Sequence, residues 1–250
     1  LVMFVSMRAH QGQETRPEVA DAYMKNQTRH STPNSIDPKT DGQAKYLSLL
    51  AKNDVVFGIG PAGTGKTFLA VATGLQHLRA KKVERLILTR PAVEAGEKLG
   101  YLPGTFAEKV DPYLQPLADS LNKLMGKGIV ERMKKDGRIE IAPLAYMRGR
   151  TLEDAYVIVD EAQNCTWKQL VMVLTRLGEG SKAVLTGDIS QTDLYQSQSG
   201  LKDIVGALGH IEGIGVHEFG VVDVVRHPLV GRIVEALADR GSVTPIKAVP

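Results

Sequence analysis

Eight consecutive residues constrain this chain more than any other part of its sequence. They are Gly60, Pro61, Ala62, Gly63, Thr64, Gly65, Lys66 and Thr67, a full match to the pattern GxxxxGK(S/T). A β-branched run at residues 54–58 precedes them, and a helix-like stretch at residues 66–80 follows. This strand–loop–helix context favours a phosphate-binding loop over a flexible glycine turn.

The chemistry of phosphate explains the spacing within these eight residues. Three glycines allow successive backbone N–H groups to face inward as an anion nest. The loop ends at the N-terminus of a helix, where the partial positive charge favours phosphate. Lys66 is expected to reach the β- and γ-phosphates, and the hydroxyl of Thr67 to bind Mg²⁺. The segment therefore predicts a nucleotide site.

A second signal is an apolar strand that ends in two acids. Residues 155–160 (AYVIVD) show no polar alternation before Asp160, as expected of a strand covered on both faces. In a doubly wound sheet, ligands bind at the carboxyl ends of the strands. We therefore expect Asp160 to hold Mg²⁺ beside Thr67, and Glu161 to orient or deprotonate an attacking water. Without the phosphate loop, such a strand end would be interpreted as an exposed turn.

A third group follows the strand predicted at residues 182–186. The turn contains Asp188, which could position it, and Gln191, which could sense the γ-phosphate or the water by hydrogen bonding. The alternative is a plain turn built on Gly-Asp chemistry.

Strands alternate with helices along the chain, which predicts an α/β fold with a parallel sheet and helices on both faces. Strands are predicted at residues 54–58, 85–89, 138–142, 155–160, 182–186 and 215–219. Helices are predicted at residues 43–51, 66–80, 113–135, 167–177, 200–208 and 228–240.

The polar stretch at the start differs from the rest. Residues 1–37 contain little apolar periodicity and are predicted to form a disordered leader. Residues 38–240 are predicted to form one domain that contains the nucleotide site, and residues 241–250 a tail. No hydrophobic segment suits a signal peptide or a membrane span, so we expect a protein without a membrane partner.

Amino-acid composition further limits the location and the binding partners that this protein can have. The single cysteine, Cys165, cannot form an internal disulfide, which favours a reducing, cytoplasmic location. The net charge of +3 is too small to indicate nucleic acid or a membrane surface by itself. With aromatic residues at 5%, a base-stacking platform is not expected.

Several long strings together resemble the PhoH family, the phosphate-starvation-inducible ATPases of bacteria related to superfamily 1 helicase cores. These strings are GPAGTGKT at residues 60–67, TRPAVEAGEKLG at 89–100, VIVDEAQN at 157–164, LTGDISQTDL at 185–194 and DVVRHPLV at 223–230. The resemblance covers residues 38–240. It implies a P-loop NTPase fold of RecA/helicase type, ATP binding and hydrolysis with Mg²⁺, a cytoplasmic location and a link to RNA metabolism.

The resemblance also suggests roles for single residues. DEAQ at residues 160–163 resembles the second helicase motif, and GDISQ at 187–191 the third. Gln43 resembles an upstream glutamine that reads adenine, although it could equally be a surface residue. Arg226 resembles the arginine that touches the γ-phosphate and neutralises transition-state charge; the alternative is an interfacial or capping arginine.

Assembly, partners and coupling stay open at this stage. The family resemblance points to homo-oligomeric rings, with hexamers suspected, in which Arg226 acts in cis or in trans. Longer family members carry an RNA-binding KH-like segment, for which residues 1–37 are too short and too polar. RNA or an RNA-processing protein is a possible partner because the resemblance implies a link to RNA metabolism. The alternative function is a nucleotide-dependent binding module that regulates an RNA-processing partner with little turnover.

Three further arginines fall at strand ends on the ligand side of the predicted sheet. Arg90, Arg148 and Arg150 could contact phosphate or RNA, or they could form structural salt bridges. The sequence does not separate these two interpretations.

Overall fold

A computed structural model describes residues 36–91, 106–194 and 199–225. Its centre is one parallel sheet of six strands in the order β3-β2-β4-β5-β1-β6. The strands are β1 (Val55–Ile59), β2 (Arg85–Arg90), β3 (Ile139–Pro143), β4 (Ala155–Val159), β5 (Lys182–Gly187) and β6 (Ile214–Glu218). Each lies within one residue of a predicted strand at both ends, so the sheet is confirmed.

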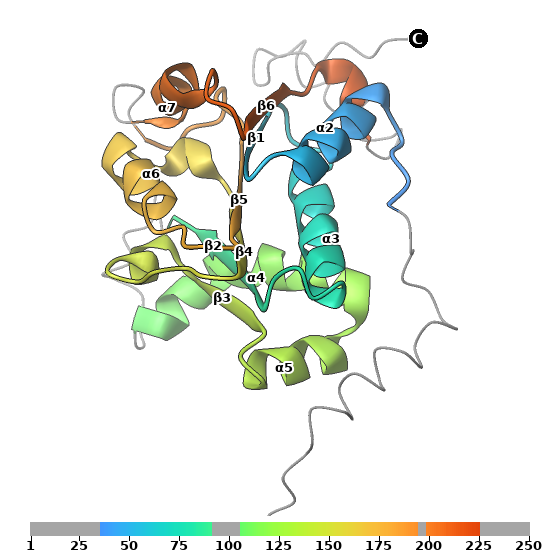
Figure 1. Cartoon of the computed structure of the whole chain (residues 1–250), viewed down its shortest axis with the longest axis vertical. Helices are drawn as coiled ribbons and strands as arrows, with labels where there is room; N and C mark the ends of the chain where they lie inside the picture. Colours follow the sequence, from blue (N-terminus) through green and yellow to red (C-terminus); the bar gives the residue numbers. More distant parts are fainter. Residues whose placement is uncertain (1–35, 92–105, 195–198, 226–250) are drawn as a thin grey trace, which may run out of the picture. The chain divides into compact units, whose positions relative to one another are not determined.

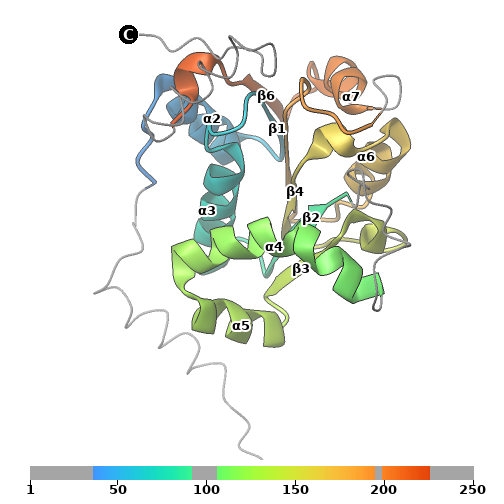
Figure 2. The same cartoon turned by 180° about the vertical axis from the view of Figure 1, so that it is seen from behind.

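Helices cover both faces of this sheet, as Figures 1 and 2 show. On one side lie α2 (Asp41–Lys52), α3 (Lys66–Arg79) and α5 (Lys127–Lys135), and on the other α6 (Trp167–Leu174) and α7 (Leu201–Leu208). Helix α4 (Phe106–Met125) packs against α3, β2 and β3. Three short 3₁₀ turns complete the described elements: η3 (Leu144–Met147), η4 (Ala162–Asn164) and η5 (Val221–Asp223).

The central strand β4 is apolar throughout because helices cover both of its faces. Val157 and Val159 belong to the core that α6 and α7 complete with Leu170 and Ile204. On the opposite face, α3 approaches so closely that a Cβ on Gly74 would lie 2.8 Å from a ring carbon of Tyr156. Because every β4 side chain is buried from one face or the other, an unbroken apolar run is required.

The helices differ from the prediction mainly at one point. The single helix expected at residues 113–135 is wrong: α4 and α5 are separate helices that meet at Gly126, whose φ of 83° lies outside the helical region. The helix predicted at residues 228–240, the tail, and the leader except Ile36 and Asp37 lie outside the described residues. Within the described part, no helix is both long and apolar enough to cross a membrane.

Candidate nucleotide-binding site

The glycine-rich segment forms the turn between β1 and α3. Gly60, Gly63 and Gly65 all have positive φ angles, of 145°, 88° and 82°. Gly60 has no room for a side chain, because a Cβ there would lie 2.6 Å from the carbonyl oxygen of Phe219. The amide of Gly60 also donates to the carbonyl of Gly187 at the end of β5 (3.0 Å). The loop and the parallel sheet together give the chain an α/β P-loop NTPase fold.

Lys66 and Thr64 brace this loop from within. Lys66 Nζ donates to the carbonyl of Pro61 at 3.0 Å, and the buried Thr64 hydroxyl donates to the same carbonyl at 3.1 Å. The lysine head group therefore lies over the loop at the N-terminus of α3. That is the place where the partial positive charge of a helix favours phosphate.

Three side-chain oxygens converge where Mg²⁺ was predicted. Thr67 Oγ1 donates to Asp160 Oδ1 at 2.7 Å, and Thr186 Oγ1 donates to the same oxygen at 2.8 Å. Asp160 is only 7% exposed. Hydroxyl and carboxylate oxygens are hard donors of the kind that Mg²⁺ takes together with waters and nucleotide phosphates. The residues present therefore fit the ion.

Thr186 has a place in this group that the sequence interpretation did not assign to it. In the sequence it is only the last residue of the strand predicted at residues 182–186. In the sheet, β5 lies between β1 and β4, so the hydroxyl of Thr186 lies next to both Thr67 Oγ1 (3.4 Å) and Asp160 Oδ1 (2.8 Å). A hydroxyl two residues before Asp188 was the available signal, but only the strand order gives it a meaning.

Glu161 follows Asp160 in an uncommon backbone conformation. Its φ and ψ are 53° and 43°, the left-handed region that costs a non-glycine residue about 1–2 kcal/mol. Its carboxylate accepts hydrogen bonds on both oxygens: Oε1 from Arg90 Nη2 at 3.1 Å, and Oε2 from the side-chain amide of Gln163. The Glu161 side chain is 35% exposed, so it is not sealed from solvent.

Gln163 is a second residue whose role the sequence did not reveal. Its buried amide connects Glu161 with the predicted sensor turn, because Oε1 accepts from the amide of Asp188 (3.0 Å) and Nε2 also reaches the carbonyl of Gln191 (3.3 Å). Gly187 must lack a side chain here, since a Cβ would lie 2.7 Å from Gln163 Oε1. The strings DEAQ and GDISQ thus form one hydrogen-bonded unit.

Asp188 organises the turn that carries Gln191. Asp188 Oδ1 accepts from the amide and the hydroxyl of Ser190, at 3.0 and 2.6 Å. Asp188 Oδ2 accepts from Gln191 Nε2 at 2.7 Å. The positioning role expected of Asp188 agrees with this geometry, and Gln191 lies exposed at the edge of the site.

Gln43 lies against the phosphate loop and not on the surface. Its Nε2 donates to the carbonyl of Thr64 at 3.0 Å, and its Oε1 accepts from the amide of Lys39 at 2.8 Å. Only 5% of the surface of Gln43 is exposed, so the alternative that Gln43 is a surface residue is wrong.

Asp223 holds the start of α2, the helix that carries Gln43. Its carboxylate accepts from the hydroxyl of Thr40 at 2.6 Å, from the amide of Gly42 at 3.2 Å and from the amide of Gly220 at 3.0 Å. Burial opposes the charge, but these three hydrogen bonds and the nearby His217 outweigh it and lower the pKa of Asp223. The segment that begins DVV is therefore anchored beside the loop.

Arg226 itself lies outside the described residues. The residue before it, Val225, donates its amide to the carbonyl of Gly63 at 2.9 Å. The chain therefore passes directly over the phosphate loop immediately before Arg226.

The three further arginines and Cys165 lie in different surroundings. Arg150 forms a two-pronged salt bridge to Glu140 (2.6 and 2.8 Å), the structural alternative, while Arg148 is exposed. Arg90 is salt-bridged as well, but to the site residue Glu161. Cys165 is buried in the core, and burial raises the pKa of its thiol to about 12.

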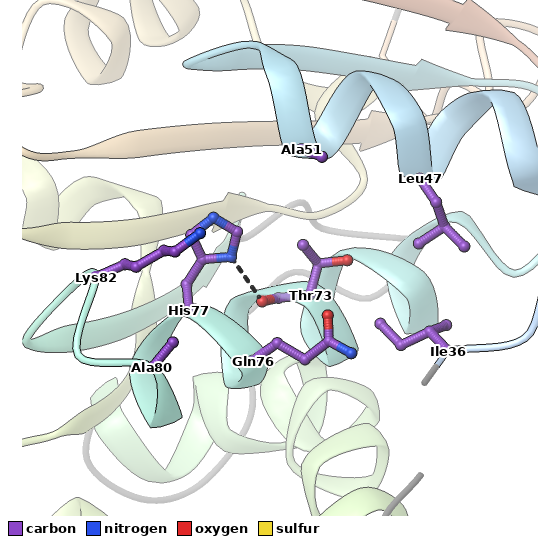
Figure 3. Close-up of a pocket in the computed structure, with 8 residues that line it drawn as sticks. All are labelled: Ile36, Leu47, Ala51, Thr73, Gln76, His77, Ala80 and Lys82. Carbon is purple, nitrogen blue, oxygen red and sulfur yellow. Dashed lines mark hydrogen bonds between the residues drawn. The ribbon is translucent and has the colours of Figure 1, made fainter. Parts of the chain in front are cut away.

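A separate hollow of about 350 Å³ lies between α2 and α3, away from the loop (Figure 3). Its lining is Ile36, Leu47, Ala51, Thr73, Gln76, His77, Ala80 and Lys82. Among the residues that the structure describes, no group of three histidine, cysteine or acidic side chains is arranged to hold a metal. The loop and the Thr67–Asp160–Thr186 group therefore remain the candidate site.

Comparison with known proteins identifies clear relatives. The family described as PhoH-like protein matches residues 35–238. A PhoH-like protein of Bacillus subtilis (strain 168) is 56% identical over 210 residues, which are 84% of this chain and 66% of the relative. Protein PhoH of Escherichia coli (strain K12) is 41% identical over 216 residues, 85% of this chain and 60% of the relative. The chain thus spans about 60–66% of the length of these two relatives.

Solved structures give a weaker likeness. The Pif1 helicase from Candida albicans aligns with a TM-score of 0.40 and 18% identity, over 84% of this chain and 46% of that one. The fold assignment rests on the sheet order and the loop, and not on this alignment.

Proposed function

This chain belongs to the family of PhoH-like proteins, and from that premise we propose that it binds ATP with Mg²⁺ and hydrolyses it. The observation that carries the proposal is the meeting of Thr67 with Asp160 (2.7 Å) at the end of the phosphate loop, with Glu161 as the next residue. A loop and a buried carboxylate suffice for binding. Glu161 adds the group that hydrolysis requires.

Each residue of the proposed site has a chemical task. The loop amides and Lys66 hold the β- and γ-phosphates, while Thr67 and Asp160 hold the ion. Mg²⁺, when bound, neutralises the charge that develops on the phosphate oxygens. Lys66 must leave the carbonyl of Pro61 to reach a phosphate, an exchange of one acceptor for a charged one.

Hydrolysis in this scheme is a single displacement. The oxygen of water bonds to the γ-phosphorus, and the bond from phosphorus to the bridging oxygen breaks with its electron pair remaining on ADP. The Glu161 carboxylate takes the proton of the water. Gln191 and Arg226 are proposed to contact the γ-phosphate, and Gln43 the adenine; the Gln43 amide would then exchange its bond to Thr64 or Lys39 for the base.

We further propose that the protein acts in the cytoplasm and that its ATP cycle is coupled to RNA metabolism. This part rests on the family resemblance of DEAQ and GDISQ to helicase motifs. The physical support is that Gln163 joins those two strings directly, so a change at the γ-phosphate would reach the sensor turn. The alternative is a nucleotide-controlled binding module with little turnover.

Steady-state ATP turnover, measured with and without single-stranded RNA, tests these proposals together with two variants. Lys66→Ala should lose both tight ATP binding and hydrolysis. Glu161→Gln should retain ATP binding within about threefold and lose at least about 100-fold in kcat, because only water activation is removed. Equal turnover by Glu161→Gln and wild type would overturn the assignment of the base. Tight ATP binding without turnover in the wild type, with or without RNA, would favour the binding module.

A further inference from the structure

The Glu161 carboxylate is tied to a neighbouring strand by an arginine that no motif assignment has used. Arg90 is the last residue of β2. Directly before it, the carbonyl of Thr89 accepts a hydrogen bond at 2.9 Å from the amide of Asp160, which follows the adjacent strand β4. Parallel pairing therefore places the Arg90 side chain beside the acids that follow β4. From there Arg90 Nη2 reaches Glu161 Oε1 at 3.1 Å.

The same guanidinium is anchored on a third element. Arg90 Nη1 donates to the backbone carbonyl of Tyr113 in α4 at 3.4 Å. One planar group thus links β2, α4 and the acidic segment that follows β4. Its side chain is 22% exposed and that of Glu161 35%, so the pair is partly shielded from water and holds its geometry better than a fully exposed pair.

Glu161 needs such support because of its backbone. A glutamate in the left-handed region persists only where its surroundings over-determine it. Here Arg90, which precedes Glu161 in the sequence, donates to one carboxylate oxygen. Gln163, which follows Glu161, donates to the other. A carboxylate held at both oxygens keeps one orientation, which is what a general base requires before water arrives.

We propose that Arg90 is a positioning residue for ATP hydrolysis, which orients the Glu161 carboxylate toward the attacking water. The proposal rests on the proposed function. Arg90 acts through Glu161, not on the phosphates, so its loss should lower kcat and leave ATP binding intact. Loss of Arg90 would then slow hydrolysis without weakening ATP binding, whereas loss of Lys66 is expected to impair both.

Arg90→Gln tests this directly, with Arg150→Gln as the matched control. Arg150 also forms an ion pair of similar exposure, but it follows the turn η3, and its partner Glu140 lies in β3 and not in the site. In Arg90→Gln we expect kcat to fall about 10-fold to 100-fold. The Kd for ATP with Mg²⁺, measured by direct titration, should stay within about twofold. Arg150→Gln should keep kcat within about twofold, whatever it does to the melting temperature.

Two further variants test whether the effect passes through Glu161. Arg90→Lys keeps a positive charge but lacks the fork that serves Glu161 and Tyr113 together, so it should recover part of the lost kcat. Adding Arg90→Gln to Glu161→Gln should cause no further loss of kcat. In the nucleotide-free protein, it should also lower the melting temperature less than it does in the wild type, because the ion pair is already gone.

The outcomes separate failure of this proposal from failure of the proposed function. If Glu161→Gln abolishes turnover while Arg90→Gln does not lower it, the positioning role is wrong and the base stands. A rise in the Kd for ATP of 10-fold or more in Arg90→Gln would assign Arg90 to phosphate binding instead. If Glu161→Gln hydrolyses ATP like the wild type, the proposed function fails first, and the role of Arg90 fails with it.

Discussion

At the scale of single residues, the site depends on buried oxygens whose partners come from other elements. Asp160 Oδ1 accepts from one hydroxyl of α3 and one of β5. Each donor stabilises the carboxylate in a place with 7% exposure, where an unsatisfied charge would be costly. These hydroxyls also fix where the carboxylate points, so they influence any ion that it holds.

Thr186→Val should therefore weaken the site while preserving its volume. Removing the hydroxyl frees Asp160 to turn, and we expect about a 10-fold higher Mg²⁺ concentration for half-maximal turnover. Magnesium titration of ATPase activity is the measurement.

Thr89→Val is the matched control for that change. Thr89 occupies the same kind of place, fully buried near the end of β2, but its hydroxyl has no hydrogen-bond partner in the described part of the chain. Its replacement should leave the magnesium dependence within about twofold. Equal effects of the two valines would show that the hydroxyl of Thr186 has no special role.

At the scale of elements, α2 links the adenine end of the proposed site to the segment after β6. Thr40 caps the helix by accepting from the amide of Gln43 at 3.2 Å. Asp223 then binds both Thr40 and Gly42, so the helix start is held from outside the helix. Because Gln43 in turn donates to the carbonyl of Thr64, displacement of α2 would strain or break a hydrogen bond to the phosphate loop.

Asp223→Asn should destabilise the protein in a pH-dependent way. The pKa of Asp223 is lowered in the folded state, so its carboxylate stabilises the fold above the ordinary aspartate pKa of about 3.9. This contribution should be complete near pH 7 and be lost as the pH falls from about 4 through the lowered pKa. We expect a loss of about 1–3 kcal/mol at pH 7, measured by urea unfolding, that shrinks toward zero below pH 4. A difference independent of pH would mean that the charge of Asp223 is not what holds α2.

At the scale of the whole molecule, the strand order determines which loops meet. β1 lies between β5 and β6, and β4 lies beyond β5. The phosphate loop after β1, the acids after β4 and the sensor turn after β5 therefore emerge at one edge of the sheet. This is the arrangement in which open α/β sheets bind ligands.

Mixing two inactive variants tests the assembly expected from the family resemblance. If the protein forms rings and Arg226 acts on the neighbouring loop, some interfaces in a mixture of Lys66→Ala and Arg226→Ala chains pair an intact loop with an intact arginine. Random assembly of equal amounts gives about one such interface in four, so turnover should recover to about a quarter of wild type. No recovery in verified mixed oligomers, or full activity in a monomer, would mean that Arg226 acts in cis or not at all.

The sequence by itself determined the strands, the phosphate loop and the two acids, because each is a local pattern. The short apolar run of β4, followed by polar turn residues, indicates a strand covered on both faces, and GPAGTGKT places its glycines where the backbone must turn. The break between α4 and α5 escaped this reasoning, since one Gly126 within a helical pattern does not by itself end a helix.

Only the tertiary structure decided which side chains support the site. Thr186 serves Asp160 because β5 is inserted between β1 and β4, an order that differs from the order along the chain. Arg90 meets Glu161 across 71 positions, and Asp223 meets Thr40 across 183. Such contacts arise when crossovers bring distant strand ends to one edge of the sheet, and no local period in the sequence encodes that pairing.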